Sequence, residues 1–177
     1  MGHSERMTDM LQRFNPKADE AVRLAIRAQH IERWKTPRSA YPMDRIGYLK
    51  WRKDLYGIQA ETAAELLRQA GCDASVVKRV ANMVAKKNLK ASADTQLLED
   101  VSALVFLEHY LPGFYDSHAD YSEQKWIGIL GKTWAKMSDA AREFVNSGNL
   151  ILQDRLAPLV NKAIAPGKNK QGPGGSG

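Results

Sequence analysis

Cysteine is almost absent from this sequence, and long apolar runs are missing altogether. The single cysteine, Cys72, cannot form an internal disulfide, and no neighbouring histidine supports it as a nucleophile. The longest nearly apolar run near the centre, Val101 to Leu107, is far shorter than the roughly 20 residues that cross a bilayer. The N-terminal residues also lack the basic-then-apolar order of a secretory signal. We therefore expect a cytoplasmic protein without disulfides or membrane spans.

Strand-like alternation of apolar and polar side chains is missing as well. With 177 residues, of which 44% are hydrophobic, the chain is long enough to bury one sizeable hydrophobic core but too short to bury two of that size. The sequence predicts an all-α fold, a compact multi-helix single domain over residues 1–164. Residues 165–177 are rich in glycine and lysine and are predicted to form a disordered tail.

Helical spacing of apolar residues runs through most of the chain. It predicts a helix from Ala18 to Trp34, which Thr36-Pro37 ends because the residue before a proline is driven out of the helical region. A long helix follows from Met43 to Ala70, with Gly57 as its bend or break. Further helices are predicted over residues 76–87 and 95–110, after Ser122, from Ser138, and over 149–164, with Leu111-Pro112-Gly113 as a stop.

The segment from Arg33 to Lys53 is strongly basic. It holds seven basic residues against one acid, interleaved with tryptophan and tyrosine, and its balance of +6 equals the net charge of the whole chain. Forked guanidinium groups and lysine charges suit phosphate, so the segment predicts an anion-binding pocket. The predicted ligand-binding residues are Arg33, Arg38, Tyr41, Arg45, Lys50 and Arg52, joined by Lys87 from a later helix.

Two other interpretations of the basic segment stay open. The cations can form a solvated face while Tyr48, Leu49 and Trp51 pack inward. Alternatively, they can track the phosphates of a nucleic acid, with aromatic rings stacking on unpaired bases. No zinc finger, homeodomain, leucine zipper or RNA-recognition signature is visible, so sequence-specific recognition is not expected.

Several long strings in the sequence resemble one protein family. AQHIERWKTPRSAYPMDRIGYLKWR, AETAAELLRQAG, VAKKNLK and QLLEDVSALVFLEHY, within residues 18–137, are similar to an uncharacterised family of bacterial and fungal soluble proteins known only as a domain of unknown function. Some members bear the name glutamyl-tRNA synthetase. This chain has neither a HIGH-like nucleotide-binding signature nor the length for that enzyme, so we set the name aside.

The order of helices also resembles that of the His-Asp (HD) metal-dependent phosphohydrolases. In that superfamily an early helical histidine, a His-Asp pair and a late aspartate hold the metal. By this resemblance His30 and Asp100 stand for the first and last ligands, as metal-binding or catalytic acid-base groups. Where the middle histidine is expected the chain has Gln59, and no His-Asp dipeptide occurs. A glutamine oxygen is a poor substitute for imidazole on a transition metal.

Both candidate catalytic residues also have structural interpretations. His30 can be satisfied by a hydrogen bond in the core, and Asp100 can form a buried salt bridge with Arg38, Arg45 or Arg52. His3 is expected in a frayed terminus. No pair of histidines has the short spacing of a structural zinc site.

The sequence thus predicts a central cavity lined by His30, residues 37–52 and the helix that carries Asp100. Its expected function is to bind a phosphate-containing small molecule or nucleotide and, as a phosphohydrolase, to cleave it. Whether a divalent metal is the cofactor stays open. The alternatives are a non-catalytic anion-binding module with a degenerate metal site and a nucleic-acid accessory protein. No membrane partner is expected, and homo-oligomerisation stays open.

Overall fold

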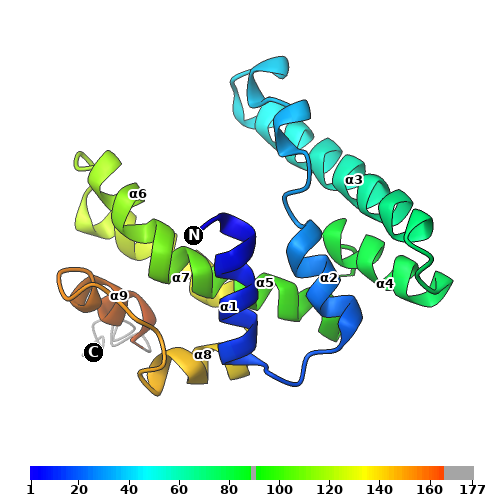
Figure 1. Cartoon of the computed structure of the whole chain (residues 1–177). Coiled ribbons are helices and arrows are strands. Elements are labelled where there is room, and N and C mark those ends of the chain that lie inside the picture. The colour runs from blue at the N-terminus through cyan, green and yellow to red at the C-terminus, as the bar shows by residue number, and fades with distance from the viewer. Residues whose placement is uncertain (89–90, 166–177) are drawn as a thin grey trace, which may run out of the picture. The chain divides into compact units, whose positions relative to one another are not determined.

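The computed structural model describes residues 1–88 and 91–165, and all regular elements in these ranges are helical (Figure 1). The predicted all-α class is confirmed. The predicted tail lies outside the described residues except for Ala165. The chain divides into two compact units, Met1–Val105 and Phe106–Gly177, which we describe separately. The single domain over residues 1–164 stays a prediction. No helix in the described ranges is long and apolar enough to cross a membrane.

The described residues of unit 1, 1–88 and 91–105, form five α-helices and two short 3-10 turns. Helix α2 packs against α1, α4 and α5, while α3 packs mainly along α4. The apolar residues spaced three and four apart on these helices form the core, in which Met7, Ile26, Val80 and Leu104 are almost completely buried. The elements are α1 (His3–Phe14), α2 (Glu20–Ala28), η1 (Arg33–Lys35), η2 (Arg38–Ala40), α3 (Arg45–Gln69), α4 (Ala74–Val84) and α5 (Ala93–Val105).

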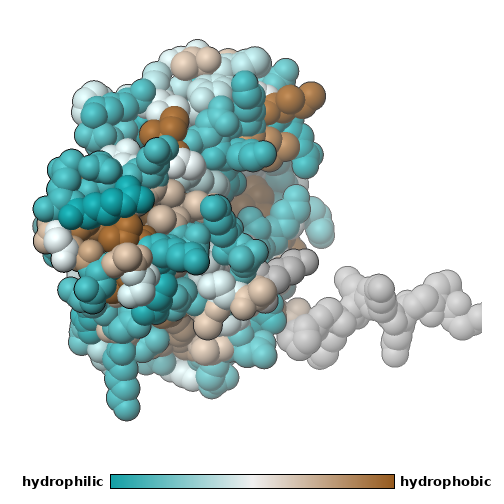
Figure 2. Space-filling model, turned by 90° about the vertical axis from the view of Figure 1, so that its right-hand side faces the viewer, coloured by the Kyte–Doolittle hydropathy of each residue, from teal (hydrophilic) through white to brown (hydrophobic). Residues whose placement is uncertain are grey.

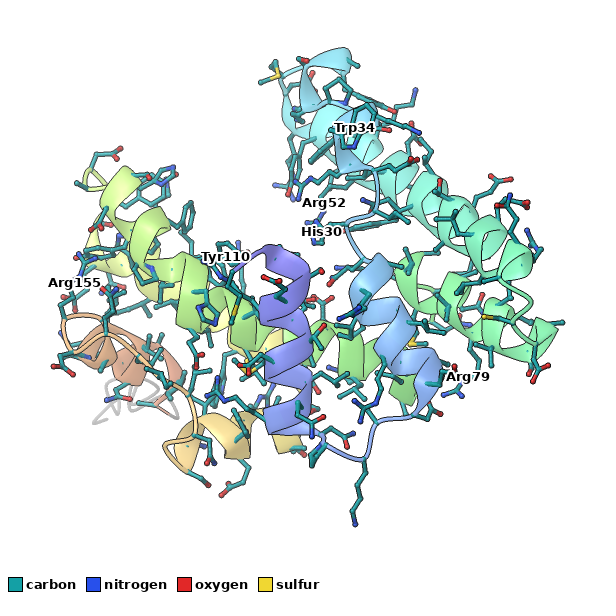
Figure 3. All side chains as sticks on the ribbon, in the orientation of Figure 1. His30, Trp34, Arg52, Arg79, Tyr110 and Arg155 are labelled. Atoms are coloured by element: carbon teal, nitrogen blue, oxygen red, sulfur yellow. The ribbon has the colours of Figure 1, made fainter. Side chains whose placement is uncertain are left out.

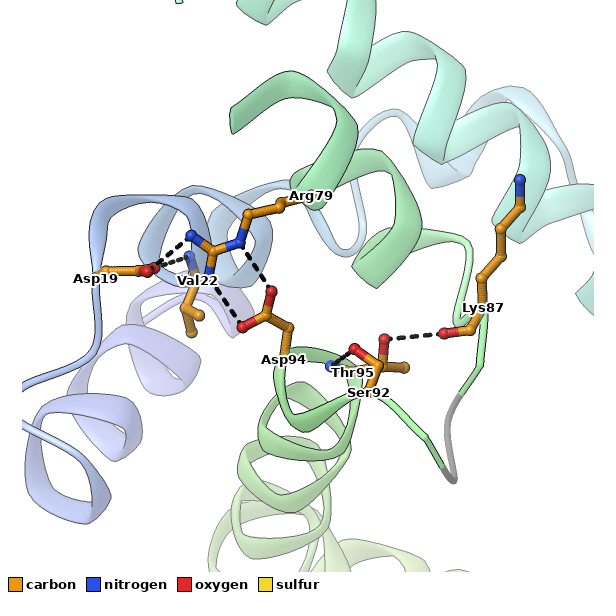
Figure 4. A network of polar contacts seen from close by, with 7 residues as sticks. All are labelled: Asp19, Val22, Arg79, Lys87, Ser92, Asp94 and Thr95. Atoms are coloured by element: carbon orange, nitrogen blue, oxygen red, sulfur yellow. Dashed lines mark hydrogen bonds and ion pairs between the residues drawn. The ribbon is translucent and has the colours of Figure 1, made fainter. Parts of the chain in front are cut away.

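Arg79 on α4 joins the starts of α2 and α5 (Figure 4). Its guanidinium donates to both carboxylate oxygens of Asp94 at 2.9 Å and to Oδ2 of Asp19 at 2.8 Å. Asp19 also caps α2, because its Oδ1 accepts from the amide of Val22 at 3.2 Å. The hydrogen bond from Arg79 lowers the pKa of Asp19. This network connects the three helices.

The segment before α3 folds back along the N-terminal half of that helix. Asp44 caps α3 by accepting from the amide of Gly47 at 2.7 Å, and the indole of Trp51 donates to the carbonyl of Thr36 at 2.9 Å. A side chain at Gly47 would overlap the carbonyl oxygen of Pro42. The absence of a side chain at Gly47 therefore allows the close approach of the segment.

Two predicted boundaries in unit 1 are wrong. Helix α2 ends at Ala28 instead of Trp34, and the backbone then turns through Glu32, whose φ of 47° lies in the left-handed region. Helix α3 runs without a break through Gly57, where a Cβ would meet nothing within 4 Å. No close contact therefore requires a glycine at this position, and the helical hydrogen bonding continues through it.

Unit 2 contains a π-helix, η3 (Phe106–Tyr110), followed by α6 (Leu111–Ser117), α7 (Glu123–Lys136), α8 (Asp139–Asn146) and α9 (Ala157–Ile164). The stop predicted at residues 111–113 is wrong, because Pro112 occupies the first turn of α6, where its missing amide hydrogen costs nothing. Ser122 and Ser138 cap α7 and α8 as expected. Helix α7 packs against α9, and the helix predicted over 149–164 is confirmed only from residue 157 onward.

Candidate functional site

Basic and aromatic side chains meet in unit 1 around the C-terminal end of α2. We call the set of His30, Arg33, Arg52 and Lys86 the basic cluster. His30 follows α2, Arg33 opens η1, Arg52 lies on α3, and Lys86 lies just beyond α4. Figure 3 shows the side chains of His30 and Arg52 above the end of α2. Two helical elements and two turns of unit 1 therefore contribute to this cluster.

His30 is linked directly to Arg33. Nη1 of Arg33 lies 3.2 Å from Nδ1 of His30, and a guanidinium can only donate, so Nδ1 accepts and the neutral ring carries its proton on Nε2. Burial by the surrounding protein, followed by the positive charges of His3, Arg33 and Lys86, lowers the pKa of His30 to about 4. His30 is thus neutral at pH 7 and offers Nε2–H as a donor.

Arg52 is held by tyrosines instead of acids. Its Nε donates to the hydroxyl of Tyr56 at 2.9 Å, its Nη2 donates to the same oxygen, and its Nη1 donates to the hydroxyl of Tyr48 at 3.3 Å. The guanidinium also lies 5.4 Å from the ring centroid of Tyr56, a cation–π distance. No carboxylate pairs with Arg52 within the ranges that the structure describes. Its charge is oriented but not neutralised.

Lys86 enters the cluster from a strained turn. Its φ of 54° is in the left-handed region, which is unfavourable for residues with a side chain. Nζ lies 4.9 Å from the ring centroid of Tyr56 and pairs with Glu99 of α5 at 3.1 Å. Both side chains of this ion pair are largely buried, at 19% and 16% exposure. Strain of this kind is frequent at functional sites, where the surrounding structure maintains it.

The balance of charge in the cluster favours an anion. Arg33, Arg52 and Lys86 bring three permanent cations, and Glu99 is the one carboxylate that pairs with them among the described residues. Arg33 lies 5.3 Å from the ring centroid of Trp51, so an aromatic face supports this cation too. Unneutralised guanidinium groups beside a lysine form a phosphate-binding arrangement.

Asp100, the second predicted catalytic residue, is buried on α5 and accepts a hydrogen bond from Nε2 of Gln96 at 2.9 Å. Its neighbour Glu99 supplies the carboxylate that reaches Lys86. Gln59, which stands where the HD resemblance places a histidine, is buried with Nε2 3.4 Å from the carbonyl of Ile31. The catalytic and metal-binding roles of His30 and Asp100 stay predictions.

The described residues do not provide a complete set of metal ligands. No group of three or more histidine, cysteine, aspartate or glutamate side chains is arranged to hold a metal ion within residues 1–88 and 91–165. Gln59 binds a backbone carbonyl and brings no imidazole. Because the residues do not fit the metal site of the HD superfamily, we derive no chemical step through a metal.

Several other predicted ligand-binding residues have structural partners. Arg38 donates to the carbonyls of Tyr41, Pro42 and Asp44 at 3.2, 2.7 and 3.2 Å, which holds the turn before α3. The hydroxyl of Tyr41 donates to Asp54 at 3.0 Å. The guanidinium of Arg38 also lies 5.8 Å from the ring centroid of Tyr48, whose hydroxyl accepts from Arg52, so Arg38 borders the basic cluster through this ring. No contact in the described part of the chain links Tyr41 to the cluster.

The remaining predicted ligand-binding residues, Arg45, Lys50 and Lys87, are exposed. Lys87 accepts a hydrogen bond from Thr95 through its carbonyl oxygen at 3.0 Å (Figure 4). No contact in the described part of the chain places their charged groups beside His30 or Arg52. Of the predicted site residues, the structure therefore brings together His30, Arg33 and Arg52.

Sequence reasoning missed three members of this region. Tyr56 and Glu99 carry no motif of their own, and their roles follow from the packing of α3 and α5 around the turn after α4. His3 was expected in a frayed terminus, but it begins α1, and its ring centroid lies 4.2 Å from that of His30. The amphipathic pattern of α1, which buries Met7, Met10 and Leu11, is the signal that could have revealed an ordered N-terminus.

Comparison with known proteins identifies the family but not its activity. A family model described as "Domain of unknown function (DUF4202)" matches residues 1–160, and the chain belongs to this family. No curated protein and no solved structure matches the chain. The resemblance to an uncharacterised family is confirmed, whereas the likeness to HD phosphohydrolases stays a prediction.

Proposed function

We propose that this member of the DUF4202 family binds a phosphate-containing small molecule or nucleotide at the basic cluster. The observation that supports this proposal is the meeting of Arg33, Arg52 and Lys86 beside a neutral histidine, with Glu99 as the paired carboxylate. Cations that are brought together without matching acids repel one another. A bound phosphate removes that repulsion and receives hydrogen bonds from each of them.

The contacts within the cluster assign a role to each donor. The two guanidinium groups offer forked hydrogen bonds to phosphate oxygens, and their planes are supported by Trp51 and Tyr56. Lys86 contributes a compact point charge. His30 donates from Nε2, since Nδ1 already accepts from Arg33.

The proposal is tested with Arg52→Gln. Titration calorimetry and thermal unfolding at low salt measure the binding of inorganic phosphate, pyrophosphate and a panel of nucleotides. A hydrogen bond to a charged group contributes about 1.5–3 kcal/mol, so we expect affinity to fall roughly 10- to 100-fold. The substitution removes the positive charge at position 52 and leaves Tyr48 and Tyr56 in place.

The matched control is Arg68→Gln. Arg68 lies on the same helix, is exposed, and pairs with Glu65 at 3.4 Å. This variant should bind the anion as the unaltered protein does. Equal losses in both variants, or no stabilisation by any phosphate compound, would contradict the proposed site.

Hydrolysis of the bound compound is an extension of this proposal, and it is supported by the resemblance to HD phosphohydrolases alone. The assay is release of inorganic phosphate from each compound that binds, with and without added divalent cations. His30→Gln and Asp100→Asn should abolish release if these residues are catalytic. Intact binding without turnover in the unaltered protein would make the chain a binding module, which is the alternative function.

A further inference from the structure

Large apolar side chains stand exposed on the N-terminal half of α3. Ile46 is 80% exposed, Leu49 is 54% exposed, and Met43, immediately before the helix cap, is 79% exposed. Lys50 and Lys53 are exposed between them. We call Met43, Ile46, Leu49, Lys50 and Lys53 the α3 outer face. Figure 2 shows such brown hydrophobic residues in small groups among teal hydrophilic ones on one side of the molecule.

The four helical members of this face form one stripe. At about 100° per residue, positions 46, 49, 50 and 53 fall within roughly 100° of the helix circumference. The inward side of the same helix buries Gly47, Trp51 and Leu55. Packing within unit 1 therefore accounts for the inward side and leaves the outer stripe without a protein partner among the described residues of this unit.

The two lysines of the face are also unneutralised. Neither Lys50 nor Lys53 has an ion pair or hydrogen bond in the described part of the chain, whereas nearby Lys35 pairs with Glu32 at 2.7 Å. The nearby carboxylate of Asp54 accepts from the hydroxyl of Tyr41. Isolated apolar residues on a surface need no explanation, but an apolar stripe flanked by free cations indicates an interaction site.

We propose that the α3 outer face binds the surface of an anionic lipid bilayer. Ile46, Leu49 and Met43 enter the boundary between headgroups and acyl chains, and Lys50 and Lys53 contact lipid phosphates and carboxylates. The face projects outward, as the high exposure of Ile46 and Met43 shows, and its members line none of the described pockets. A bilayer surface needs no groove, whereas a docked peptide does.

Two other occupants fit the same face less well. A symmetric dimer built on this face would bring four lysines into one interface with no acid among the members of the face, and like charges repel. A single-stranded nucleic acid needs aromatic rings for stacking, but Met43, Ile46 and Leu49 have none. The lipid assignment departs from the sequence-based expectation of no membrane partner, because the sequence does not show which apolar residues of α3 stay outside the core.

Vesicle flotation of the full chain tests the proposal. Vesicles of phosphatidylcholine with phosphatidylserine should carry the protein upward at low salt, and vesicles of phosphatidylcholine alone should not. Ile46→Ser with Leu49→Ser should abolish flotation. Lys50→Gln with Lys53→Gln should weaken binding roughly 30-fold, since each lysine near an anionic surface contributes about a fivefold gain.

The matched control is Leu66→Ser with Arg68→Gln, an exposed apolar and basic pair on the C-terminal half of α3. It should float as the unaltered protein does, and so should Arg52→Gln, which separates this proposal from the anion site. The lipid proposal is overturned by absent flotation, by equal flotation on neutral vesicles, or by equal losses in the control. It is also overturned if the Ile46 and Leu49 substitutions instead dissociate a dimer in sedimentation velocity or remove binding to single-stranded DNA.

Discussion

His30 is a residue whose protonation is set by its neighbours. Its surroundings, above all burial, lower its pKa from 6.5 to about 4. Between these values the unfolded chain takes up a proton that the folded protein excludes. The free energy of unfolding should therefore decrease as the pH falls from about 6.5 to 4.

His30→Gln removes this source of pH dependence, so urea unfolding at a series of pH values should show a shallower decrease in the variant. Part of the slope should remain, because the pKa of His3 is also lowered, by burial first and then by Arg33 and Arg6. An identical slope in both proteins would mean that the pKa of His30 is the same in the folded and unfolded states.

At the residue scale, the types of the site residues were easier to predict than their partners. The basic segment and the lone histidine before it predicted a site with His30, Arg33 and Arg52, and the structure places these three residues in one region of unit 1. The choice of Lys87 over Lys86 has no sequence basis, because the backbone after α4 turns through the left-handed region at Lys86 and points that side chain toward Glu99. Only the folded backbone distinguishes the two adjacent lysines.

At the scale of elements, Arg79 is the connection between three helices. Arg79→Met keeps the length of the side chain but removes the contacts to Asp94 and Asp19. We expect the free energy of unfolding to decrease by about 1 kcal/mol, because the network is partly exposed yet includes a two-pronged guanidinium–carboxylate contact. Chemical unfolding measures the change.

Arg68→Met serves as the comparison for Arg79→Met. Arg68 pairs with Glu65 within the same helix and joins no second element, so its loss should change stability by less than half as much. A larger effect at Arg68 than at Arg79 would show that the connection between helices contributes little.

Helix starts were predicted better than helix ends. Ser122 and Ser138 are capping residues, which act locally and can be read from the sequence. The end of α2 depends on the tertiary position of the following turn, and the π-helix at residues 106–110 interrupts a continuous apolar pattern. Spacing at three and four residues does not encode such an interruption.

On the scale of the whole molecule, all four members of the basic cluster and the α3 outer face belong to unit 1. The net charge of +6 equals the excess in residues 33–53, so the positive charge of the chain is concentrated where both proposed ligands bind. An anionic surface and an anionic small molecule are each attracted to this unit.

Unit 1 has its own core, in which α1, α2, α4 and α5 bury residues such as Met10, Val22, Val80 and Leu98. A chain of this length can bury enough apolar surface to fold alone. We therefore expect a fragment of residues 1–105 to unfold cooperatively, as followed by circular dichroism, and to bind the same phosphate compound with an affinity that falls on Arg52→Gln. A folded fragment that binds no anion recognised by the full chain would mean that residues beyond 105 contribute to the site. An unfolded fragment would show that unit 1 depends on unit 2 for its stability.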